Sequence, residues 1–533
     1  MTSNDHDVVV AGGGPVGLML ACELRSAGVS VLVLERQAAP DPMPKAGIIG
    51  PLAAEAIARL GLGDELMAAE AEAIRRDEEM LAKLMAQGGP PGGSGSPGGP
   101  GGPGGPGRPG GGRPPGHAGP PEHFAGLPLD ASRSSDPARR RVRVDQLTLH
   151  RILADHAGRL GVEVRHEHEV LDLGQDEQGV TVGVATPDGP LQVRCAYLVG
   201  CDGGRSTVRR LAGFDFAGSD PTLTGRQGLV RMADPGGLRP GFNLTPSGGY
   251  LFAAFGANRV ATVEFDGPPE DRDAPLTREE LQESVRRVSG TEATIGELLS
   301  GVRFTDHTRQ ATTYRLGRVL LAGDSAHVHP PFGGQGLNVG LVDAANLGWK
   351  LAAQVQGWAP EGLLDTYTAE RHPVAAQLLD NTRAQTALMR PDPQSRALRE
   401  LFAGVLALDA VNRRLYDMVT GLSVRHDLGE DTPLTGTLLP DLELSTGGSL
   451  FDHLGRGRGV LLDLADRAEV RAAAAGWSER IEIVTAQLKI DEVDALLLRP
   501  DGCVAWELPA GADPRHKALP AALARWFGAG RGG

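Results

Sequence analysis

The hydrophobic pattern at the start of the chain predicts a strand, a helix and a second strand in close succession. The apolar residues 8–10 are typical of a short buried strand, and they run into a glycine-rich turn. Apolar positions then recur with helical spacing over residues 16–27, and residues 29–34 form a second apolar run. This order of elements is a βαβ unit, which predicts a parallel sheet covered by helices.

The glycine-rich turn has the spacing of a dinucleotide-binding loop. Gly12, Gly14 and Gly17 fit the G-x-G-x-x-G pattern, in which the glycines make a tight turn, admit a pyrophosphate and let helix and strand pack closely. The helix that begins near Val16 would direct its free N–H groups and its dipole at the phosphates. Glu35 ends the second strand, where an acidic residue would bind ribose hydroxyls.

Further buried strands are expected at residues 191–200 and 318–322, and each leads into a turn that combines glycine with aspartate. Hairpin strands are expected at residues 162–165 and 180–185, and Gly61 is placed to end a helix. The helices of this part are expected at residues 52–60, 145–159, 339–356 and 364–385.

Residues 219–309 show a different pattern, in which strands alternate with loops before a helix that begins with a capping box near Thr277. It predicts a mostly antiparallel sheet, inserted between two parts of the dinucleotide domain and covering the substrate. A separate small α/β unit is expected after residue 436. Its strands are expected at residues 459–464, 481–485 and 495–498, and its helices at 468–475 and 518–527.

Composition and charge exclude several classes of protein. The chain has 533 residues and a net charge of −14, which disfavours a nucleic-acid partner. No apolar stretch is long enough to cross a membrane and the start carries no secretory signal, so we expect a soluble cytoplasmic protein. The four scattered cysteines indicate reduced packing residues. The oligomeric state stays open, with a homodimer among the options.

Three other features receive no catalytic role. Residues 88–121 are a Gly/Pro/Ser tract that cannot bury enough apolar surface to order itself, so we expect a disordered insertion. The basic run at residues 139–143 is expected to be a solvated loop edge, with the steering of an anionic cofactor such as NADPH as the alternative. His327 and His329 resemble a pair of metal ligands. Without nearby acids, we expect both side chains to pack within the loop and to bind no metal.

Three stretches far apart in the sequence, at Gly12, Asp202-Gly203 and Gly323-Asp324, each place glycine at the end of a strand. This is expected if all three converge on one extended cofactor. Together with Arg205-Ser206 and with the run from Gly334 to Asn338, they resemble the class A, single-component flavoprotein monooxygenases, the family of para-hydroxybenzoate hydroxylase. The resemblance covers nearly the whole chain.

The resemblance implies roles for individual residues. Asp324 would bind ribityl or ribose hydroxyls of FAD, and Asp202 would lie near the pyrophosphate and the path of NADPH. The amides at Gly336, Leu337 and Asn338 would face the flavin pyrimidine, where a helix amino terminus stabilises the negative charge of the reduced ring. The full set expected to bind the cofactor is Gly12, Gly14, Pro15, Val16, Gly17, Glu35, Arg36, Lys45, Gln146, Asp202, Gly203, Gly323, Asp324, Pro331, Gly334, Gly336, Leu337 and Asn338.

Residues 197–206 and 343–351 look closest to the subgroup that acts on aromatic polyketides in antibiotic-producing actinomycetes. That subgroup has a carboxyl-terminal thioredoxin-like domain without redox cysteines, which fits the chain after residue 436. The implied fold is α/β, with a Rossmann-type FAD-binding domain, an inserted mostly antiparallel substrate domain and a small thioredoxin-like domain. The expected division is 1–175 and 311–435 for the FAD-binding domain, 176–310 for the mixed part with the substrate-covering sheet, and 436–533 for the last domain.

The implied activity is hydroxylation of a polycyclic aromatic polyketide in antibiotic biosynthesis, with FAD, NADPH and oxygen, through a flavin C4a-hydroperoxide. No side chains with nucleophile–base spacing stand out, so the catalytic residues stay unassigned, and the oxygen chemistry would belong to the cofactor. The chain also has no second G-x-G-x-x-G unit for NADPH, which suits a class where nicotinamide binds transiently.

One departure from the family keeps alternatives open. Many relatives carry an arginine near the FAD phosphates or over the flavin, whereas this chain has Lys45 and then Gly50-Pro51-Leu52. A lysine supplies a point charge without the planar fork of arginine. This departure keeps Baeyer–Villiger insertion of oxygen next to a ketone as an alternative to aromatic hydroxylation. Inactivation of an aromatic antibiotic and a non-catalytic FAD-binding role are further alternatives, and the three intact flavin motifs disfavour the last.

Overall fold

The fold was analysed in a computed structural model, which describes residues 6–41, 43, 46–86, 122–253, 259–272, 274–430, 432–487, 490, 492–513 and 519–530. The Gly/Pro tract predicted to be disordered and Lys45 both lie outside the described residues.

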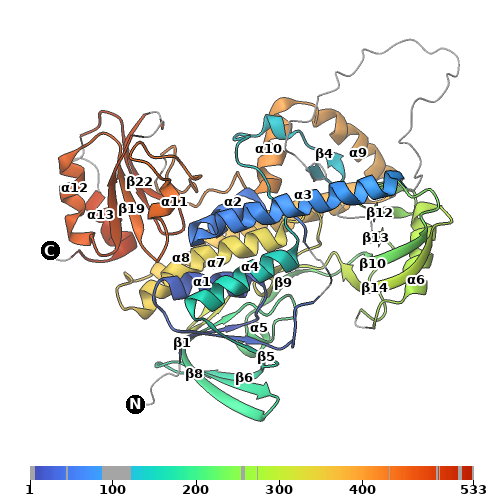
Figure 1. The fold of residues 1–533 in the computed structure, drawn as a ribbon, viewed down its shortest axis with the longest axis horizontal. Coiled ribbons are helices and arrows are strands. Elements are labelled where there is room, and N and C mark those ends of the chain that lie inside the picture. Colours follow the sequence, from blue (N-terminus) through green and yellow to red (C-terminus); the bar gives the residue numbers. More distant parts are fainter. Residues whose placement is uncertain are drawn as a thin grey trace.

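The predicted parallel sheet lies below a layer of helices in the view of Figure 1. Its strand order is β16-β17-β8-β1-β2-β5, and β8 also pairs with the antiparallel hairpin of β6 and β7. Strand β1 lies between β2 and β8 and is parallel to both. Val8, Val9 and Val10 of β1 are fully buried, as the apolar run predicted. The strands are β1 (His6–Ala11), β2 (Val31–Glu35), β5 (Glu163–His166), β6 (Glu169–Gln175), β7 (Val180–Thr186), β8 (Gly189–Gly200), β16 (Arg315–Leu316) and β17 (Val319–Leu321).

Helices pack together against this sheet (Figure 1). Helix α1 contacts both α4 and α7, and α2 also packs on α7. Helix α7 is buried along most of its length, which explains its nearly continuous apolar sequence. The helices of this layer are α1 (Pro15–Ser26), α2 (Pro51–Ile57), α4 (Gln146–Leu160), α5 (Thr207–Leu211), α7 (Gly336–Val355) and α8 (Thr366–Met389).

The predicted helix end at Gly61 is confirmed by its backbone conformation. Gly61 has a φ of 78° and makes a kink inside η1 (Ala58–Leu62), after which the chain continues into α3 (Gly63–Ala86). Glycine tolerates this left-handed conformation at a helix end, and here a second helix begins directly after it. The long helix α3 was not predicted.

The inserted region folds as the predicted antiparallel sheet. Its strand order is β11-β12-β13-β10-β14, and helix α6 packs against one face (Figure 1). The side chain of Thr277 caps α6 by accepting a hydrogen bond from the N–H of Glu280 (3.2 Å), as the capping box predicted. The elements are β10 (Thr224–Asp234), β11 (Gly241–Thr245), β12 (Gly248–Phe252), β13 (Arg259–Glu264), α6 (Arg278–Ser289) and β14 (Thr294–Thr305).

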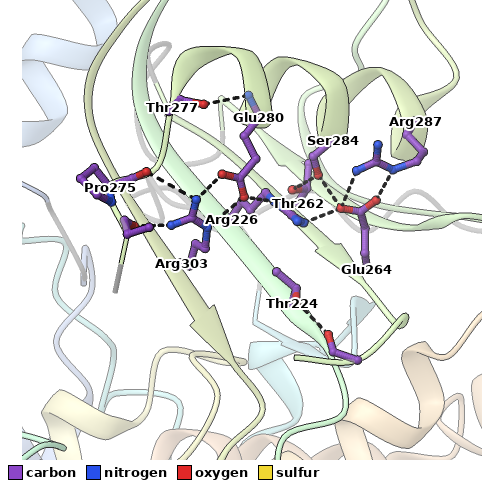
Figure 2. Close-up of polar contacts among 12 residues, drawn as sticks. Thr224, Arg226, Thr262, Glu264, Pro275, Thr277, Glu280, Ser284, Arg287 and Arg303 are labelled. Atoms are coloured by element: carbon purple, nitrogen blue, oxygen red, sulfur yellow. Dashed lines mark hydrogen bonds and ion pairs between the residues drawn. The ribbon is translucent and has the colours of Figure 1, made fainter. Parts of the chain in front are cut away.

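A network of charges lies between α6 and this sheet (Figure 2). The buried carboxylate of Glu264 accepts from Arg226 (2.5 Å) and from Arg287 (2.6 Å). Arg226 also donates to Glu280 (2.8 Å), which in turn pairs with Arg303. The network fastens the helix to the sheet, since each carboxylate joins side chains from different elements.

The carboxyl-terminal part of the chain forms its own four-stranded sheet, with the order β20-β19-β21-β22. Strands β19 and β20 are parallel, and the other pairs are antiparallel. This mixed sheet with flanking helices confirms the predicted small α/β fold. Cys503, in the turn between β21 and β22, is buried and free. The elements are α11 (Leu450–His453), β19 (Gly459–Asp463), α12 (Ala468–Ala474), β20 (Ile481–Thr485), β21 (Val493–Leu498), β22 (Val504–Pro509) and α13 (Leu519–Phe527).

Smaller elements connect these layers, and they include two helices, α9 and α10, that the sequence pattern did not predict. The exact domain boundaries stay a prediction. The connecting elements are β3 (His123–Phe124), β4 (Leu127–Pro128), η2 (Ala131–Arg133), β9 (Phe216–Ser219), β15 (Thr308–Ala311), η3 (Gly323–Ser325), β18 (His327–Val328), η4 (Leu363–Asp365), α9 (Pro393–Val405), α10 (Asp409–Thr420) and η5 (Ala475–Trp477).

Candidate functional site

A cleft of about 500 Å³ lies at the carboxyl ends of β1, β2, β8 and β17. Ligands of open α/β sheets bind at this edge. The cleft brings together most of the residues that the sequence assigned to a cofactor, from the three motifs that lie far apart along the chain. Those that line it are Gly12, Gly14, Pro15, Val16, Glu35, Arg36, Gln146, Asp202, Gly203, Asp324, Pro331, Gly334, Gly336 and Leu337.

The three glycines of the first turn meet different surroundings. Gly12 has a φ of 108°, and a Cβ there would lie 2.3 Å from the carbonyl oxygen of Cys201. A Cβ on Gly17 would lie 2.0 Å from the carbonyl oxygen of Gly12. A Cβ on Gly14 would meet no atom within 4 Å, because it would point into open space. Gly12 and Gly17 therefore allow close packing, whereas Gly14 leaves room beside the amino terminus of α1.

The carboxylate of Glu35 stands at the end of β2 on the wall of the cleft. One oxygen accepts from the N–H of Gly13 (2.8 Å), and the other accepts from the N–H of Gln37 (2.8 Å). These bonds orient the carboxylate and tie the glycine turn to the second strand. Each carboxylate oxygen has a second lone pair, so Glu35 can still accept from a hydroxyl group in the cleft.

Asp202 acts as a brace within the protein. Its carboxylate accepts from the N–H groups of Thr207 (2.7 Å) and Val208 (3.1 Å) at the amino terminus of α5. It also accepts from the hydroxyls of Ser206 and of Ser325 (2.9 Å). Because Ser325 follows the Gly323-Asp324 turn, this contact joins two of the three motifs.

The third motif presents Asp324 to the cleft. Asp324 is exposed within the short helix η3, whereas its neighbours Gly323 and Ser325 are buried. Helix α7 begins close by, and a Cβ on Gly336 would lie 3.8 Å from the Asp324 carboxylate. The first N–H groups of a helix have no acceptor inside the helix. Gly336 and Leu337 line the cleft, so the amino terminus of α7 is directed at whatever binds there.

His329 also lines the cleft, and the sequence analysis did not assign it there. Its Nδ1 hydrogen-bonds the carbonyl oxygen of Pro330 (2.8 Å), so this nitrogen carries the proton. A Cβ on Gly336 would lie 2.9 Å from Nε2. Burial lowers the pKa of His329 to about 4, against the opposing effect of Asp324. The imidazole is therefore neutral at pH 7, with Nε2 available as an acceptor beside the start of α7.

A buried ionic network supports the Gly323-Asp324 turn from behind. Asp343 on α7 accepts from Nε2 of His327 (2.7 Å), Nε of Arg371 (2.7 Å) and the N–H of Gly323 (3.3 Å). Burial opposes ionisation of Asp343, but Arg371 and His327 hold its pKa below the usual value. The imidazole of His327 is thus used inside the fold, as the prediction of loop packing required.

Three described residues assigned to the cofactor, Gly17, Gly323 and Asn338, do not line the cleft. Gly17 and Gly323 pack against neighbouring backbone and side chains, and Lys45 lies outside the described residues. The side chain of Asn338 accepts from the N–H of Gly50 (2.7 Å) and donates to the carbonyl oxygen of Gly334 (3.0 Å). It therefore fixes the position of the chain segment before α2, and only its backbone N–H belongs to the amino-terminal turn of α7.

The prediction of a solvated edge for the basic run at residues 139–143 is wrong. Arg139 pairs with Glu55 of α2 (2.7 Å), and Arg140 pairs with Glu70 of α3 (2.6 Å). Arg141 pairs with Glu122 (2.8 Å). These bonds fasten the segment to two helices and to the hairpin region.

Sequence reasoning also missed cleft residues for which the motifs gave little signal. Gln335 stands between two assigned glycines, and Gln37 follows the assigned Arg36. Strand β6 reaches the cleft with Glu169 and Val170, and His168 lies there just before the strand, but this strand was not predicted.

Within the described ranges, no group of three His, Cys, Asp or Glu side chains could hold a metal ion. No helix in this part of the chain is long and apolar enough to cross a membrane.

Comparison with known proteins identifies the family. Residues 5–382 match a family model described as FAD binding domain, and residues 432–530 match one described as aromatic-ring hydroxylase, C-terminal. The chain is 39% identical to a 12-dehydrotetracycline 5-monooxygenase/anhydrotetracycline 6-monooxygenase of Streptomyces rimosus subsp. rimosus, over 98% of this chain and 99% of that protein. It is 40% identical to the rifampicin monooxygenase of Streptomyces venezuelae, over 99% of this chain and 100% of that protein.

The fold agrees with that of a solved relative. The structure of OxyS anhydrotetracycline hydroxylase from Streptomyces rimosus has a TM-score of 0.84 and 37% identity, and the match covers 98% of this chain and 99% of that chain. The resemblance inferred from the motifs is confirmed. The chain belongs to the FAD-dependent aromatic monooxygenases, with the carboxyl-terminal domain of the aromatic-ring hydroxylases.

Proposed function

We propose that the protein uses NADPH and oxygen to hydroxylate a polycyclic aromatic polyketide, with FAD bound in the cleft between the three motifs. The observation that carries this proposal is the convergence of the Gly14 turn, Asp324 and the amino terminus of α7 on one cavity. The similarity to monooxygenases of tetracyclines supports the class of substrate.

The cleft has the features that FAD requires. The open space at Gly14 admits the pyrophosphate to the amino terminus of α1, where N–H groups and the helix dipole favour an anion. Glu35 is oriented to accept from the adenosine ribose, and Asp324 is exposed where the ribityl chain would pass. The cleft volume of about 500 Å³ lies within the range typical of cofactor sites, about 300–1,000 Å³.

FAD bound in this cleft would supply the redox chemistry that activates molecular oxygen. The protein contributes binding, orientation and electrostatics. The N–H groups at Gly336 and Leu337 stabilise the negative charge that reduction places on the flavin. The neutral imidazole of His329 adds no second positive charge at that position.

Aromatic side chains are concentrated between the inserted sheet and the helices α8 to α10. Phe124 and Phe332 belong to a buried apolar cluster between the inserted sheet and the helices α8 to α10. Phe242, Phe304 and Phe402 pack against this cluster from the sheet and from α9. Aromatic side chains bind flat ring systems through large apolar contacts and stacked geometry.

The proposal is tested by the products of purified protein incubated with FAD, NADPH, air and a panel of tetracyclic polyketides. We expect NADPH oxidation and a new phenol or ring alcohol on an intact carbon skeleton, assigned by NMR. An ester or lactone in place of a ketone would replace this proposal by Baeyer–Villiger oxidation. An absence of NADPH oxidation with every member of the panel would favour a non-catalytic FAD-binding role.

The similarity to rifampicin monooxygenase favours a second candidate, the inactivation of an aromatic antibiotic. This candidate predicts conversion of rifampicin by the purified protein and protection of a sensitive bacterium that expresses it. Conversion of the biosynthetic intermediates alone would exclude it.

A further inference from the structure

Three side-chain amides form a hydrogen-bonded chain that ends at the cofactor cleft. The N–H of Ala125 donates to Oε1 of Gln385 (3.0 Å). Nε2 of Gln385 donates to Oδ1 of Asn381 (3.0 Å), and Nδ2 of Asn381 donates to Oε1 of Gln335 (3.2 Å). The chain thus runs from the β3–β4 hairpin across α8 to the residue that precedes α7.

The direction of this amide chain is fixed at its first member. A backbone N–H can only donate, so Gln385 must turn its oxygen toward Ala125. Its NH₂ group then meets Asn381, which must offer its oxygen, and Asn381 in turn offers its NH₂ group to Gln335. Gln335 is left with its oxygen used and its NH₂ group directed away from the chain.

The backbone of Ala125, where the amide chain begins, is itself fixed in position. Ala125 has a φ of 53° in the turn between β3 and β4, a left-handed conformation that is strained for a residue with a side chain. Its carbonyl oxygen accepts from Nη1 of Arg399 on α9 (2.6 Å), while its N–H is bound to Gln385 on α8. Two helices therefore hold the turn in place, and the N–H keeps its direction.

The NH₂ group of Gln335 has no acceptor within the described part of the chain. Gln335 is 7% exposed, and its Nε2 is buried with no hydrogen-bond partner in the described part of the chain. The residue lines the cleft and also an inner cavity of about 60 Å³ between α7 and α8. A Cβ on Gly333 would lie 2.9 Å from Nε2, so the glycine leaves this donor uncovered. A buried donor without an acceptor is unfavourable, which points to a ligand atom as its partner.

We propose that Gln335 is a positioning residue whose NH₂ group donates a hydrogen bond to an acceptor atom of the bound flavin ring, with its direction set by Ala125, Gln385 and Asn381. The proposal rests on the proposed function only in that FAD occupies the cleft. Pro331, Gly334 and Leu337 line the cleft next to Gln335 and belong to the same segment. The donor adds to the N–H groups of α7 and favours the reduced, more negative ring.

Two substitutions elsewhere in the amide chain are expected to turn over the side-chain amide of Gln335, so that its NH₂ group and its oxygen exchange places. In Asn381→Asp the residue can only accept, so Gln335 must turn its NH₂ group inward and present its oxygen to the cleft. In Gln385→Glu the carboxylate accepts from both neighbours, Asn381 turns over, and Gln335 turns over in response. Gln335→Met removes the donor without reversing it. Gln377→Glu is the matched control, because it adds the same charge to α8 at an exposed position outside the amide chain.

The readout is the midpoint potential of bound FAD, measured by reductive titration without NADPH or substrate, together with its visible absorption spectrum. Gln335→Met is expected to weaken the preference for reduced flavin about tenfold, which corresponds to a potential about 30 mV more negative. The two reversing variants are expected to lower the potential further, and Gln377→Glu is expected to leave it unchanged.

The proposal is overturned if folded, FAD-loaded Gln335→Met, Asn381→Asp and Gln385→Glu all keep the potential and spectrum of the wild type. It is also overturned if these values stay fixed while only turnover changes, which would assign the donor to the substrate. Because neither readout needs turnover, failure of the proposed hydroxylation would leave this test intact.

Discussion

The substitution Glu370→Gln should reveal how strongly the carboxyl-terminal domain is fastened to the cofactor-binding helices. Glu370 on α8 is 4% exposed and accepts from Lys350 of α7 (2.9 Å) and from both Nη atoms of Arg499 (2.7 and 2.8 Å). Arg499 also pairs with Asp501 in the turn after β21 (2.5 Å). Both cations are completely buried, and together with the two carboxylates they form a neutral cluster.

Replacing Glu370 by glutamine keeps the shape but leaves one buried positive charge without a counterion. Breaking a buried ion pair from one side typically lowers the free energy of unfolding by about 3–5 kcal/mol. An independent upper limit on the loss in free energy of unfolding comes from Lys350, whose ordinary pKa is 10.5. The variant can remove the charge by deprotonating this lysine, which at pH 7 costs about 5 kcal/mol. We therefore expect a loss of about 3–5 kcal/mol.

The loss should depend on pH in a defined direction. Burial lowers the pKa of Lys350 to about 8 in the wild type, against the opposing effect of Glu370. Without the charge of Glu370 the pKa of Lys350 falls further. Between that lower value and pH 8 the folded variant binds one proton fewer than the folded wild type. The difference in stability therefore shrinks by about 1.4 kcal/mol per pH unit as the pH rises.

The assay is urea unfolding followed by tryptophan fluorescence, because Trp349 and Trp526 lie over Arg499 at 5.4 and 4.6 Å and report on this cluster. Glu297→Gln is the control, since Glu297 forms an exposed ion pair and should lose less than about 1 kcal/mol. A Glu370→Gln variant as stable as this control, or a deficit that does not shrink from pH 6 to pH 8, would refute the reasoning.

Three further predictions concern the cleft. Gly14→Val should weaken FAD binding at least about tenfold with little change in melting temperature, because its side chain would enter the cleft. Gly17→Val should instead destabilise the fold, because its side chain would clash with the carbonyl of Gly12. FAD titration and thermal unfolding measure the two effects, and equal results for both variants would contradict this contrast. Asp324→Ala should lose FAD during gel filtration while the apoprotein keeps its melting temperature, and retained FAD would exclude Asp324 from the site. Burial lowers the pKa of His329 in the folded protein to about 4 from the usual 6.5. The unfolded chain therefore takes up this proton first, and the free energy of unfolding falls as the pH drops from 6.5 toward 4. In urea unfolding, His329→Gln should lose less stability between pH 7 and pH 5 than the wild type, and equal losses would contradict this assignment.

The sequence pattern predicted the elements whose apolar positions are strongly periodic or continuous. The first strand, α1 and α7 begin and end within about three residues of the predicted bounds. Strand β14 was missed because its side chains alternate between partial burial and exposure, which leaves no clear apolar face. Helix α3, which begins directly after the helix end at Gly61, was missed because its sequence is rich in charged residues and few of its described side chains are buried.

The site was predictable where a residue's role depends on its neighbours in sequence, as for Gly12 and Gly17. It was not predictable where the partner lies far along the chain. Asn338 bonds to Gly50 across 288 residues, and the direction of the Gln335 amide is set by a backbone group in another layer. Such roles depend on which atoms the fold brings together, and no local spacing encodes them.

Asp202 and Asp324 show why similar motifs need not serve the same purpose. Both aspartates stand beside a glycine at the end of a strand, and both line the cleft. The Asp202 carboxylate already accepts from two backbone N–H groups and two hydroxyls, so its hydrogen-bonding capacity is used inside the protein. Asp324 is exposed, and among the described residues no N–H or hydroxyl group donates to its carboxylate. The number of donors around each carboxylate therefore separates a brace between motifs from a group available to the cofactor.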